Sequence, residues 1–406
     1  MRMLERLLPG LNWGITTTFV LFQFFIQATT GLMANRWAND FGISPAEVGN
    51  LSAAFFYAYV SLQIPVGIAF DLFGVRKIII SASVLLTLGC FMMALASSYH
   101  IALIARLLMG AGSAFGFVGM LYITAAWFTP KQFAVLVGIA ETTAMAGVAL
   151  GEVGMASLIT QHGWRYSMHL SGFVALLITL LSILFIRDKN TPQKSSHDSQ
   201  FKMSQSIKYA LSNRQVWLAG LYGFSLMAII NVFGSLWGVP FLRDTYPWLS
   251  LYGSASLVSM VFLGVAIGGP LTAWLSNYVN KRKIIMLWMG VINTLLSLLF
   301  FLLSSATLLF LYIALLLLGL SASAYILTFA LTKETVDEKY RATCLSAMNM
   351  ILMASGPILQ PFIGYLLHHG FSYKQAMLVL PAIAAFTLIG FVFIKDSITK
   401  SNTEYD

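Results

Sequence analysis

The stretch PVGIAFDLFGVRK, residues 65–77, places a short polar turn between two long apolar segments. Asp71 stands near the end of the first segment, and Arg76 and Lys77 stand at the start of the second. An acid and two bases at a helix–helix turn can join neighbouring helix ends by charge-assisted hydrogen bonds. Because both flanking segments are long enough to cross a bilayer, the stretch predicts two membrane-spanning helices with a charged turn between them.

The composition excludes a soluble globular domain. Apolar residues make up 58% of the 406 residues, charged residues make up 10%, and the mean hydropathy is +0.80. About a dozen apolar stretches approach the ~20 residues needed to cross ~30 Å of hydrocarbon. The predicted spans are residues 13–35, 48–70, 77–97, 100–127, 132–159, 166–186, 214–240, 250–275, 283–304, 307–332, 342–368 and 373–394.

Positive charge is divided unequally between alternate loops. The N-terminus, the loops after even-numbered spans and the C-terminus hold 19 of the 24 Lys and Arg residues, whereas the opposite loops hold 4. Loops rich in Lys and Arg stay in the cytoplasm. We therefore expect a multi-pass protein of the cell (inner) membrane with both termini cytoplasmic. Topology explains the net charge of +9, and no nucleic-acid partner is expected.

A polar segment divides the spans into two groups of six. Residues 187–213 have the Ser, Gln and Lys content of a linker. The halves also repeat weakly, because LMGAGSAFGF at 108–117 matches LLGLSASAYI at 317–326. Duplicated six-helix halves are typical of transporters, which build a site between two bundles that move against each other. The predicted domains are an N-terminal six-helix bundle at 1–186, a cytoplasmic linker at 187–213 and a C-terminal six-helix bundle at 214–406.

Two motifs resemble those of the major facilitator superfamily. PVGIAFDLFGVRK at 65–77 resembles its signature between helices 2 and 3, and RLLMGAG at 106–112 resembles its helix 4 motif. The resemblance extends from the first span to the last. It implies an all-α membrane protein with 12 transmembrane helices in two pseudo-symmetric six-helix bundles, which transports by alternating access. The residues of the first motif, which we assign to gating, are Gly67, Asp71, Gly74, Arg76 and Lys77.

The first motif predicts a lock between the cytoplasmic ends of helices. Hydrogen bonds from Arg76 and Lys77 to Asp71 would form it, and breaking them would favour the inward-open state. Ordinary anchoring of positive charge in the cytoplasm explains the two bases but not the acid. In the second half, WLSNYVNKRK at 274–283 has Asn277 in place of Asp71. Because this acid is missing, the stronger lock is expected in the first half.

The fifth span carries two carboxylates in a glycine-rich apolar run. Glu141 and Glu152 are eleven residues apart and therefore point to one face of a helix. A charge in hydrocarbon costs several kcal/mol, roughly 3 at a helix centre, so each is a candidate for function or for pairing. Arg106 in the fourth span has a depth similar to that of Glu152.

We expect Arg106 and Glu152 to form an ion pair. Glu141 is then expected to lie near the midplane and to carry a proton or bind substrate. The alternatives are a purely structural ion pair for Glu152 and a static, hydrogen-bonded carboxyl for Glu141.

Further polar and aromatic side chains outline a pocket. Gln23 and Gln27 follow the helical spacing of one face of the first span. Each such residue alone is more often explained by interhelical packing or by the aromatic belt at a membrane surface. Arg36 and Arg106 would suit a carboxylate, because guanidinium binds it in a bidentate way. The predicted substrate-binding residues are Gln23, Gln27, Arg36, Tyr57, Tyr122, Asn231, Trp237, Tyr325 and Asn349.

The sequence lacks the patterns of an enzyme. GAGSAFG at 110–116 mimics a dinucleotide loop, but its spacing is GxGxxxG and it lies within a spanning helix. Cys90 and Cys344 lie in different halves and offer neither a disulfide framework nor a metal spacing. No cofactor, metal or nucleotide site is expected, so transport would run on ion or solute gradients.

We therefore expect a monomeric secondary active transporter of a small anionic or zwitterionic metabolite, such as an organic acid, amino acid, short peptide or carboxylate siderophore. Proton coupling is expected, so the predicted partners are the small-molecule substrate, the proton and the lipid bilayer. A drug or siderophore efflux antiporter and a uniporter are the alternatives. Drug exporters of the superfamily tend to carry Gly-Pro in helix 5, whereas Glu152 follows Gly151 here, which weakens the export alternative.

Overall fold

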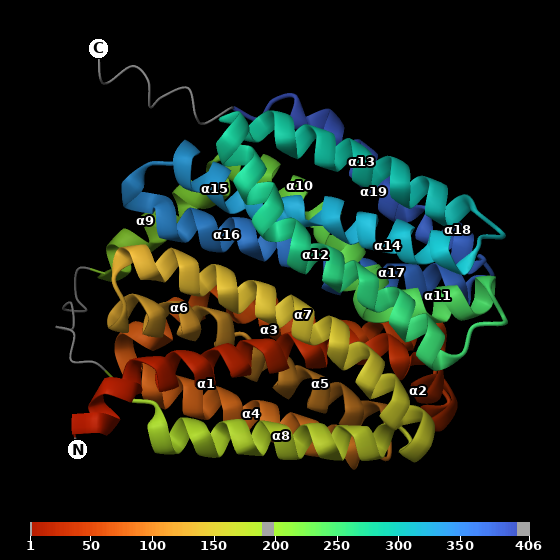
Figure 1. Ribbon diagram of the computed structural model, residues 1–406, viewed down its shortest axis with the longest axis horizontal. Coiled ribbons are helices and arrows are strands. Elements are labelled where there is room, and N and C mark those ends of the chain that lie inside the picture. Colours follow the sequence, from red (N-terminus) through yellow and green to blue (C-terminus); the bar gives the residue numbers. More distant parts are fainter. Residues whose placement is uncertain (1, 189–198, 396–406) are drawn as a thin grey trace.

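All elements in the described part of the chain are helical (Figure 1). The computed structural model describes residues 2–188 and 199–395, apart from the side chains of residues 2–6, 64, 67, 68, 71, 130, 134 and 199–204. Within these residues, 11 helices are long and apolar enough to cross a membrane. The 29-residue helix α3 (Pro45–Phe73) is long enough to be the twelfth.

The first half contains six spans. α1 (Arg2–Ala28) continues into a 3-10 turn at Thr29–Leu32, and the short helix α2 (Ala34–Phe41) connects this turn to α3. The fourth span is divided into two helices, α5 and α6. The remaining bounds are α4 Val75–Ala94, α5 Tyr99–Ser113, α6 Gly116–Trp127, α7 Pro130–His162 and α8 Trp164–Phe185.

The second half follows α9 (Ser199–Ser212), which is the described part of the predicted linker. Its first span joins α10 (Arg214–Ala228), a π-helical segment (Ile229–Trp237) and α11 (Gly238–Thr245). The remaining bounds are α12 Leu251–Val279, α13 Arg282–Leu302, α14 Leu308–Ala322, 3-10 turns at Ser323–Tyr325 and Glu338–Tyr340, α15 Ile326–Thr335, α16 Arg341–Met353, α17 Ser355–His368, α18 Tyr373–Met377 and α19 Val379–Phe391.

The predicted fold class is confirmed, and most predicted spans end within a few residues of the observed helices. The exception is the first span, because α1 accommodates Pro9 and begins well before residue 13. The exact domain boundaries stay a prediction.

Side-chain caps fix where several helices begin. Ser44 before α3, Thr129 before α7 and Ser372 before α18 each accept the backbone N–H three residues later, whose own side chain bonds back. These capping boxes satisfy free N–H groups of the first turn. Gly74 and Gly163 turn the chain between spans at φ values of 80° and 87°, a conformation that favours glycine.

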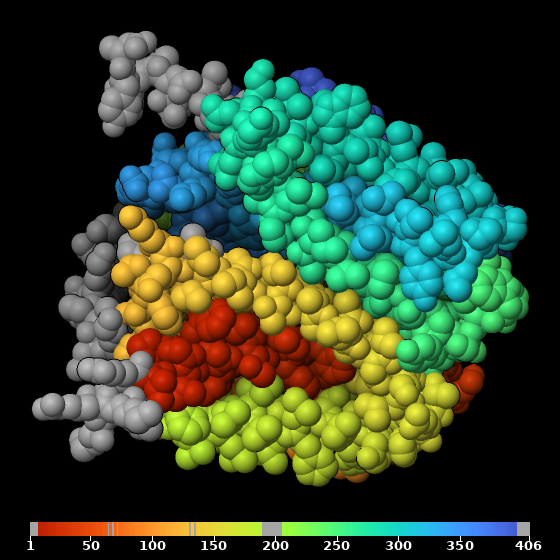
Figure 2. All heavy atoms as spheres, in the orientation of Figure 1, coloured from red at the N-terminus to blue at the C-terminus, as the bar shows by residue number. Residues whose placement is uncertain are grey.

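The two ends of the bundle differ in how the halves meet. The start of α1 and the end of α19 lie at one end, which we call the terminal side (Figure 1). α2 and α18 lie at the opposite end, which we call the far side. On the terminal side, Figure 2 shows a hollow between α7 of the first half and α12 and α16 of the second half. The structure is therefore open toward the terminal side.

The halves are closed together on the far side. Gly31, in the turn after α1, packs against the carbonyl oxygen of Leu236, where an added Cβ would come within 2.5 Å. Gly49 in α3 packs equally closely against the carbonyl oxygen of Gln360 in α17. Such distances are too short for any residue except glycine, so these glycines permit the helices of the two halves to close.

Candidate functional site

A hydrogen bond joins the two halves beside the opening. Tyr325 Oη, from the turn between α14 and α15, donates to Glu141 Oε1 of α7 at 3.0 Å. Tyr325 is 6% exposed, and Glu141 is half-buried. The second carboxyl oxygen of Glu141, Oε2, has no hydrogen-bond partner among the described residues. Two side chains from separate predicted spans thus meet, and one buried oxygen of the carboxyl is left without a hydrogen-bond partner among the described residues.

A second hydrogen bond crosses between the halves from α16 to α3. Asn349 Nδ2 donates to Gln63 Oε1 at 3.2 Å, and Gln63 is 7% exposed. Asn349, one of the predicted substrate-binding residues, therefore lies at the junction of the halves.

Uncharged hydrogen bonds form the centre of the closed far side. Gln27 Nε2 donates to Asn231 Oδ1 at 3.1 Å, which joins α1 to the π-helical segment. Asn231 Nδ2 donates to Ser355 Oγ at 3.1 Å, and the Asn231 carbonyl accepts from Gln360 Nε2 at 2.7 Å. Trp237 Nε1 donates to the Gln360 carbonyl at 3.1 Å. The predicted residues Gln27, Asn231 and Trp237 therefore lie together.

The π-helical segment contributes a further contact that the sequence did not predict. Thr30 Oγ1 donates to the backbone carbonyl of Ser235 at 2.7 Å, across the two halves. π-helical turns are rare and are frequent at functional sites. The irregular backbone at Ile229–Trp237 thus presents polar groups to the first half.

Gln23 points into the first half and does not join Gln27. It is 1% exposed, and neither atom of its amide has a hydrogen-bond partner among the described residues. Its Oε1 packs directly against Gly116 at the start of α6, where a Cβ would collide with it. Gln23 is therefore a buried amide between α1 and α6.

The predicted ion pair between Arg106 and Glu152 does not form. Arg106 Nη2 donates to the carbonyl of Ser52 at 3.1 Å, Nη1 donates to that of Ile26 at 3.4 Å, and the guanidinium lies 5.0 Å from the ring centre of Phe55. Glu152 is fully buried, and its carboxyl oxygens have no hydrogen-bond partner in the described part of the chain. The prediction fails because backbone carbonyls of α1 and α3 satisfy Arg106, which depth along the helices alone could not reveal.

Arg36 belongs to a far-side cluster that ties α2 to α8. Trp164 Nε1 donates to Asp40 Oδ2 at 2.8 Å, and Arg165 forms an ion pair with the same oxygen. The hydrogen bond from Trp164 lowers the pKa of Asp40, partial burial opposes this effect, and the hydrogen bond and charge of Arg165 and the charge of Arg36 lower it further. Arg36 thus has an electrostatic role at the far side and does not reach the terminal-side opening.

Tyr57 and Tyr122 make contacts within the first half. Tyr57 is 38% exposed, and its Oη donates to Asn50 Oδ1 of the same helix. The ring of Tyr122 in α6 stacks on Phe70 of α3 at 5.1 Å. The structure therefore does not bring these two tyrosines to Glu141.

The turn within residues 65–77, for which a gating role is predicted, has a partner at the end of α8. Arg76 N donates to Asp188 Oδ1 at 2.9 Å, and Arg76 Nη2 donates to the Ile183 carbonyl at 3.0 Å. Gly74 packs against the same carboxylate, and Lys77 is exposed. The lock predicted at Asp71 and the role of Gly67 lie outside the described side chains.

The corresponding turn of the second half does have an acidic partner. Arg282, which occupies the place of Arg76, donates to both carboxyl oxygens of Glu334 at 2.6 to 3.0 Å. It also contacts Asn277 Oδ1 at 3.4 Å. Asn277 stands in the place of Asp71, but Glu334 at the end of α15 supplies a carboxylate from another helix, and the stronger lock in the first half stays a prediction.

Comparisons with known proteins agree with this architecture. A family profile described as "Major Facilitator Superfamily" matches residues 15–351 and, in a second match, residues 245–404. The chain is 22% identical over 412 residues to the "Probable galactarate/D-glucarate transporter GarP" of Escherichia coli (strain K12), covering 92% of this chain and 91% of that protein.

Two further proteins are similar to this chain, one over about half of its length and the other over nearly all of it. The chain is 27% identical over 248 residues to a "Quinolone resistance transporter" of Acinetobacter baumannii, covering 53% of this chain and 55% of that protein. The crystal structure of a bacterial homologue of the human lysosomal transporter Spinster, in an inward-facing and unoccupied conformation, aligns with a TM-score of 0.77 at 18% identity. This alignment covers 95% of this chain and 97% of the other, and it supports the fold alone.

The family profile covers most of the chain, and the two relatives named above are transporters by name. The protein belongs to the Major Facilitator Superfamily and is a membrane transporter, not an enzyme.

Proposed function

We propose that the protein is a proton-coupled secondary transporter of a small hydroxylated organic acid and works as a monomer in the inner membrane. The observation that carries this proposal is the hydrogen bond between Tyr325 and Glu141, which places a titratable carboxyl at the moving junction of the two halves.

The terminal side is the cytoplasmic side in this proposal. In the sequence, the N-terminus, the loops after even-numbered spans and the C-terminus hold 19 of the 24 Lys and Arg residues, and positively charged loops are retained in the cytoplasm. The opening on that side then corresponds to an inward-facing state. The hydrogen bonds and glycine contacts of the far side form the closed extracellular gate.

Glu141 carries the coupling proton. It lies eleven residues from the start of α7, roughly 16 Å along the helix, and therefore on the terminal side of the membrane centre. Tyr325 holds one oxygen of its carboxyl, and the other oxygen has no hydrogen-bond partner among the described residues, so a proton there would have no competing donor. Rocking of the halves changes the position of Glu141 relative to Tyr325, so the protonation state of this carboxyl is linked to the conformation.

Glu152 holds a second proton in this state. Its side chain is fully buried near the closed far side, and a bare carboxylate in such surroundings would cost several kcal/mol. It is therefore neutral while the far side is closed and can ionise when that side opens to water. Arg106 positions α1 against α3 through the Ile26 and Ser52 carbonyls.

The substrate class follows from the polar groups at the junction. Gln27, Asn231 and Asn349 offer amide donors and acceptors, which suit the hydroxyl groups of a polyhydroxylated acid. The proton on Glu141 would offset the negative charge of one carboxylate, so that proton and acid cross together. The name of the relative from Escherichia coli, a probable galactarate/D-glucarate transporter, supports the same class.

Export is the second candidate, and the likeness to a quinolone resistance transporter favours it. Uptake and export differ in the ligand, and they differ in whether the proton moves with the ligand or against it. A thermal-shift screen of organic acids and quinolones on the purified protein separates them, because a ligand at 100 times its dissociation constant adds about 2.7 kcal/mol of stability. We expect sugar acids to stabilise the protein and an inwardly directed proton gradient to drive their saturable uptake into proteoliposomes. Stabilisation by quinolones alone would contradict the proposal.

A further inference from the structure

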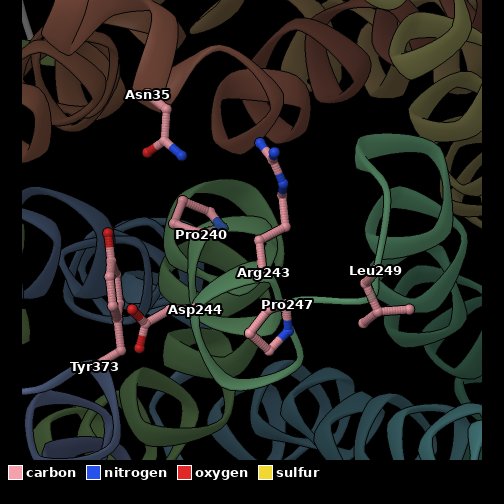
Figure 3. A pocket seen from close by; sticks show the side chains of 7 residues that line it. All are labelled: Asn35, Pro240, Arg243, Asp244, Pro247, Leu249 and Tyr373. Carbon is pink, nitrogen blue, oxygen red and sulfur yellow. The ribbon is translucent and has the colours of Figure 1, made fainter.

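A cavity of about 280 Å³ lies on the far side, between the two halves (Figure 3). Asn35 of α2 lines it from the first half. Arg243 and Asp244 at the end of α11, Pro247 and Leu249 in the following loop, and Tyr373 at the start of α18 line it from the second half. The cavity is separate from the terminal-side opening, because the closed far-side contacts lie between the two.

Three polar groups converge on this cavity from three connecting segments. The guanidinium of Arg243 extends toward the first half, and the hydroxyl of Tyr373 and the amide of Asn35 border the same space (Figure 3). Arg243 forms no ion pair with the described residues. A cation in the last turn of a helix is favoured by the helix dipole. The helix dipole explains a positive charge at residue 243, but it does not explain why Tyr373 and Asn35 border the same cavity.

The cavity is connected to the far-side gate by packed side chains. The ring of Tyr373 lies 6.3 Å from the ring of Trp237, measured between centroids. Trp237 Nε1 in turn donates to the Gln360 carbonyl, against which Gly49 of the first half packs. A ligand in the cavity would therefore contact Tyr373, which packs on a side chain that holds the gate closed.

We propose that this cavity is a second, peripheral binding site for the organic acid, with the carboxylate on Arg243 and the hydroxyl groups on Tyr373 and Asn35. Guanidinium is the side chain best suited to bidentate binding of a carboxylate. Asp244 on the Tyr373 side repels the carboxylate and orients it toward Arg243. The identity of the ligand rests on the proposed function; the anion preference of the site rests on Arg243.

The site has a consequence for transport because it is shared between the halves. Opening the far side moves Asn35 away from Arg243 and dismantles the site. A ligand that binds only the closed form shifts the population toward that form. The organic acid bound there therefore stabilises the state shown, and a high concentration on the far side slows uptake.

The test uses a reactive cysteine beside the site. Pro247→Cys places a thiol in the cavity wall without removing a polar group, and the two native cysteines, Cys90 and Cys344, are buried. Its modification rate is measured in proteoliposomes with an anionic and with a cationic methanethiosulfonate. Galactarate is the probe ligand.

We expect the anionic reagent to be favoured and galactarate to protect the cysteine. Adding Arg243→Gln should lower the anion-to-cation rate ratio about fivefold, because one nearby charge is removed, and should abolish protection. Lys374→Gln is the matched control, since Lys374 lies beside Tyr373 but bonds to Ser304 outside the cavity. An unchanged ratio in Arg243→Gln, an equal loss in Lys374→Gln, or no protection by galactarate would overturn the proposal.

This experiment is independent of proton coupling. A Glu141→Gln variant should retain the same labelling and protection, although it fails in driven uptake. The far-side site and the proton site can therefore fail separately.

Discussion

The carbonyl oxygen of Gln360 lies 2.5 Å from the position that a Cβ on Gly49 would occupy. This contact joins α3 of the first half to α17 of the second half, and Trp237 donates to the same carbonyl. Closure of the far side therefore depends on the absence of a single methyl group. The gate is made of backbone and uncharged polar groups, so salt should have little effect on it.

Gly49→Ala should favour opening of the far side. The added methyl must displace the backbone at Gln360, and overpacking of this kind costs about 1–3 kcal/mol in the closed state only. Labelling of far-side cysteine probes should increase about tenfold or more, and transport should slow. Gly138→Ala in α7 is the control, because nothing lies within 4 Å of its added Cβ. Equal labelling in both variants would show that the contact does not set the gate.

Tyr325→Phe should impair coupling more than it impairs folding. It removes the donor to Glu141 Oε1, and a hydrogen bond to a charged group contributes about 1.5–3 kcal/mol. Tyr222→Phe is the matched control, since Tyr222 Oη donates at 2.7 Å to the Met286 carbonyl within the second half. The measurement is the ratio of pH-driven accumulation to counterflow exchange. The ratio should fall only in Tyr325→Phe, and a similar fall in both variants would refute a role in coupling.

Arg106→Ala and Glu152→Ala should have additive effects on stability. The two side chains have different neighbours, so the double variant should lose the sum of the single losses within about 0.5 kcal/mol. Thermal unfolding of the parent, the two single variants and the double variant in detergent measures these losses. A double variant that is more stable than either single variant would indicate a direct ion pair after all.

Asp40 should give stability a dependence on acid pH. Its pKa is lowered in the folded protein by the hydrogen bond from Trp164 and by Arg165 and Arg36. The stabilisation is therefore complete above the unfolded-state value near pH 4 and is lost as pH falls through the lower folded value. In Asp40→Asn, the midpoint of unfolding should lose this acid-dependent component. If the unfolding midpoint fell equally with acid pH in parent and variant, the Asp40 cluster would not contribute to folding stability.

The fold could be predicted because each membrane span is determined by residues that are close together in the sequence. Apolar length and the alternation of Lys and Arg between loops depend on residues close in the chain, and the charged turn at 65–77 fixed the second and third helices. The first span of the second half is interrupted by the π-helical segment, yet Asn231 and Trp237 lie within the span predicted at 214–240. The π-helix itself was not foreseeable, because its partners lie in the other half: Thr30 bonds to the Ser235 carbonyl and Gln27 bonds to the side chain of Asn231.

The site could be predicted only as a set of residues. Glu141, Tyr325, Gln27, Asn231 and Asn349 were recognised one by one, since a polar group in a span requires a partner. Which of them meet depends on how helices of different halves are rotated and shifted, and spacing within one helix does not contain that information. The predicted ion pair between Arg106 and Glu152 was wrong for the same reason, because their relative position depends on how α5 and α7 are rotated.

The partner of Arg282 illustrates a second limit. At the position equivalent to Asp71 the second half has Asn277, whereas the carboxylate that binds Arg282 belongs to Glu334 at the end of α15. A repeat preserves the need for a counter-charge better than it preserves the helix that provides it.

The central claim is that Glu141 carries the coupling proton, and Glu141→Gln tests it most directly. Glutamine keeps the size of the side chain and mimics the protonated form permanently. In proteoliposomes with an imposed pH gradient, the variant should no longer accumulate the organic acid against its concentration gradient, while counterflow exchange and ligand-induced thermal stabilisation persist. Accumulation by Glu141→Gln that follows the imposed pH difference as in the parent would contradict the claim and would place the coupling proton elsewhere.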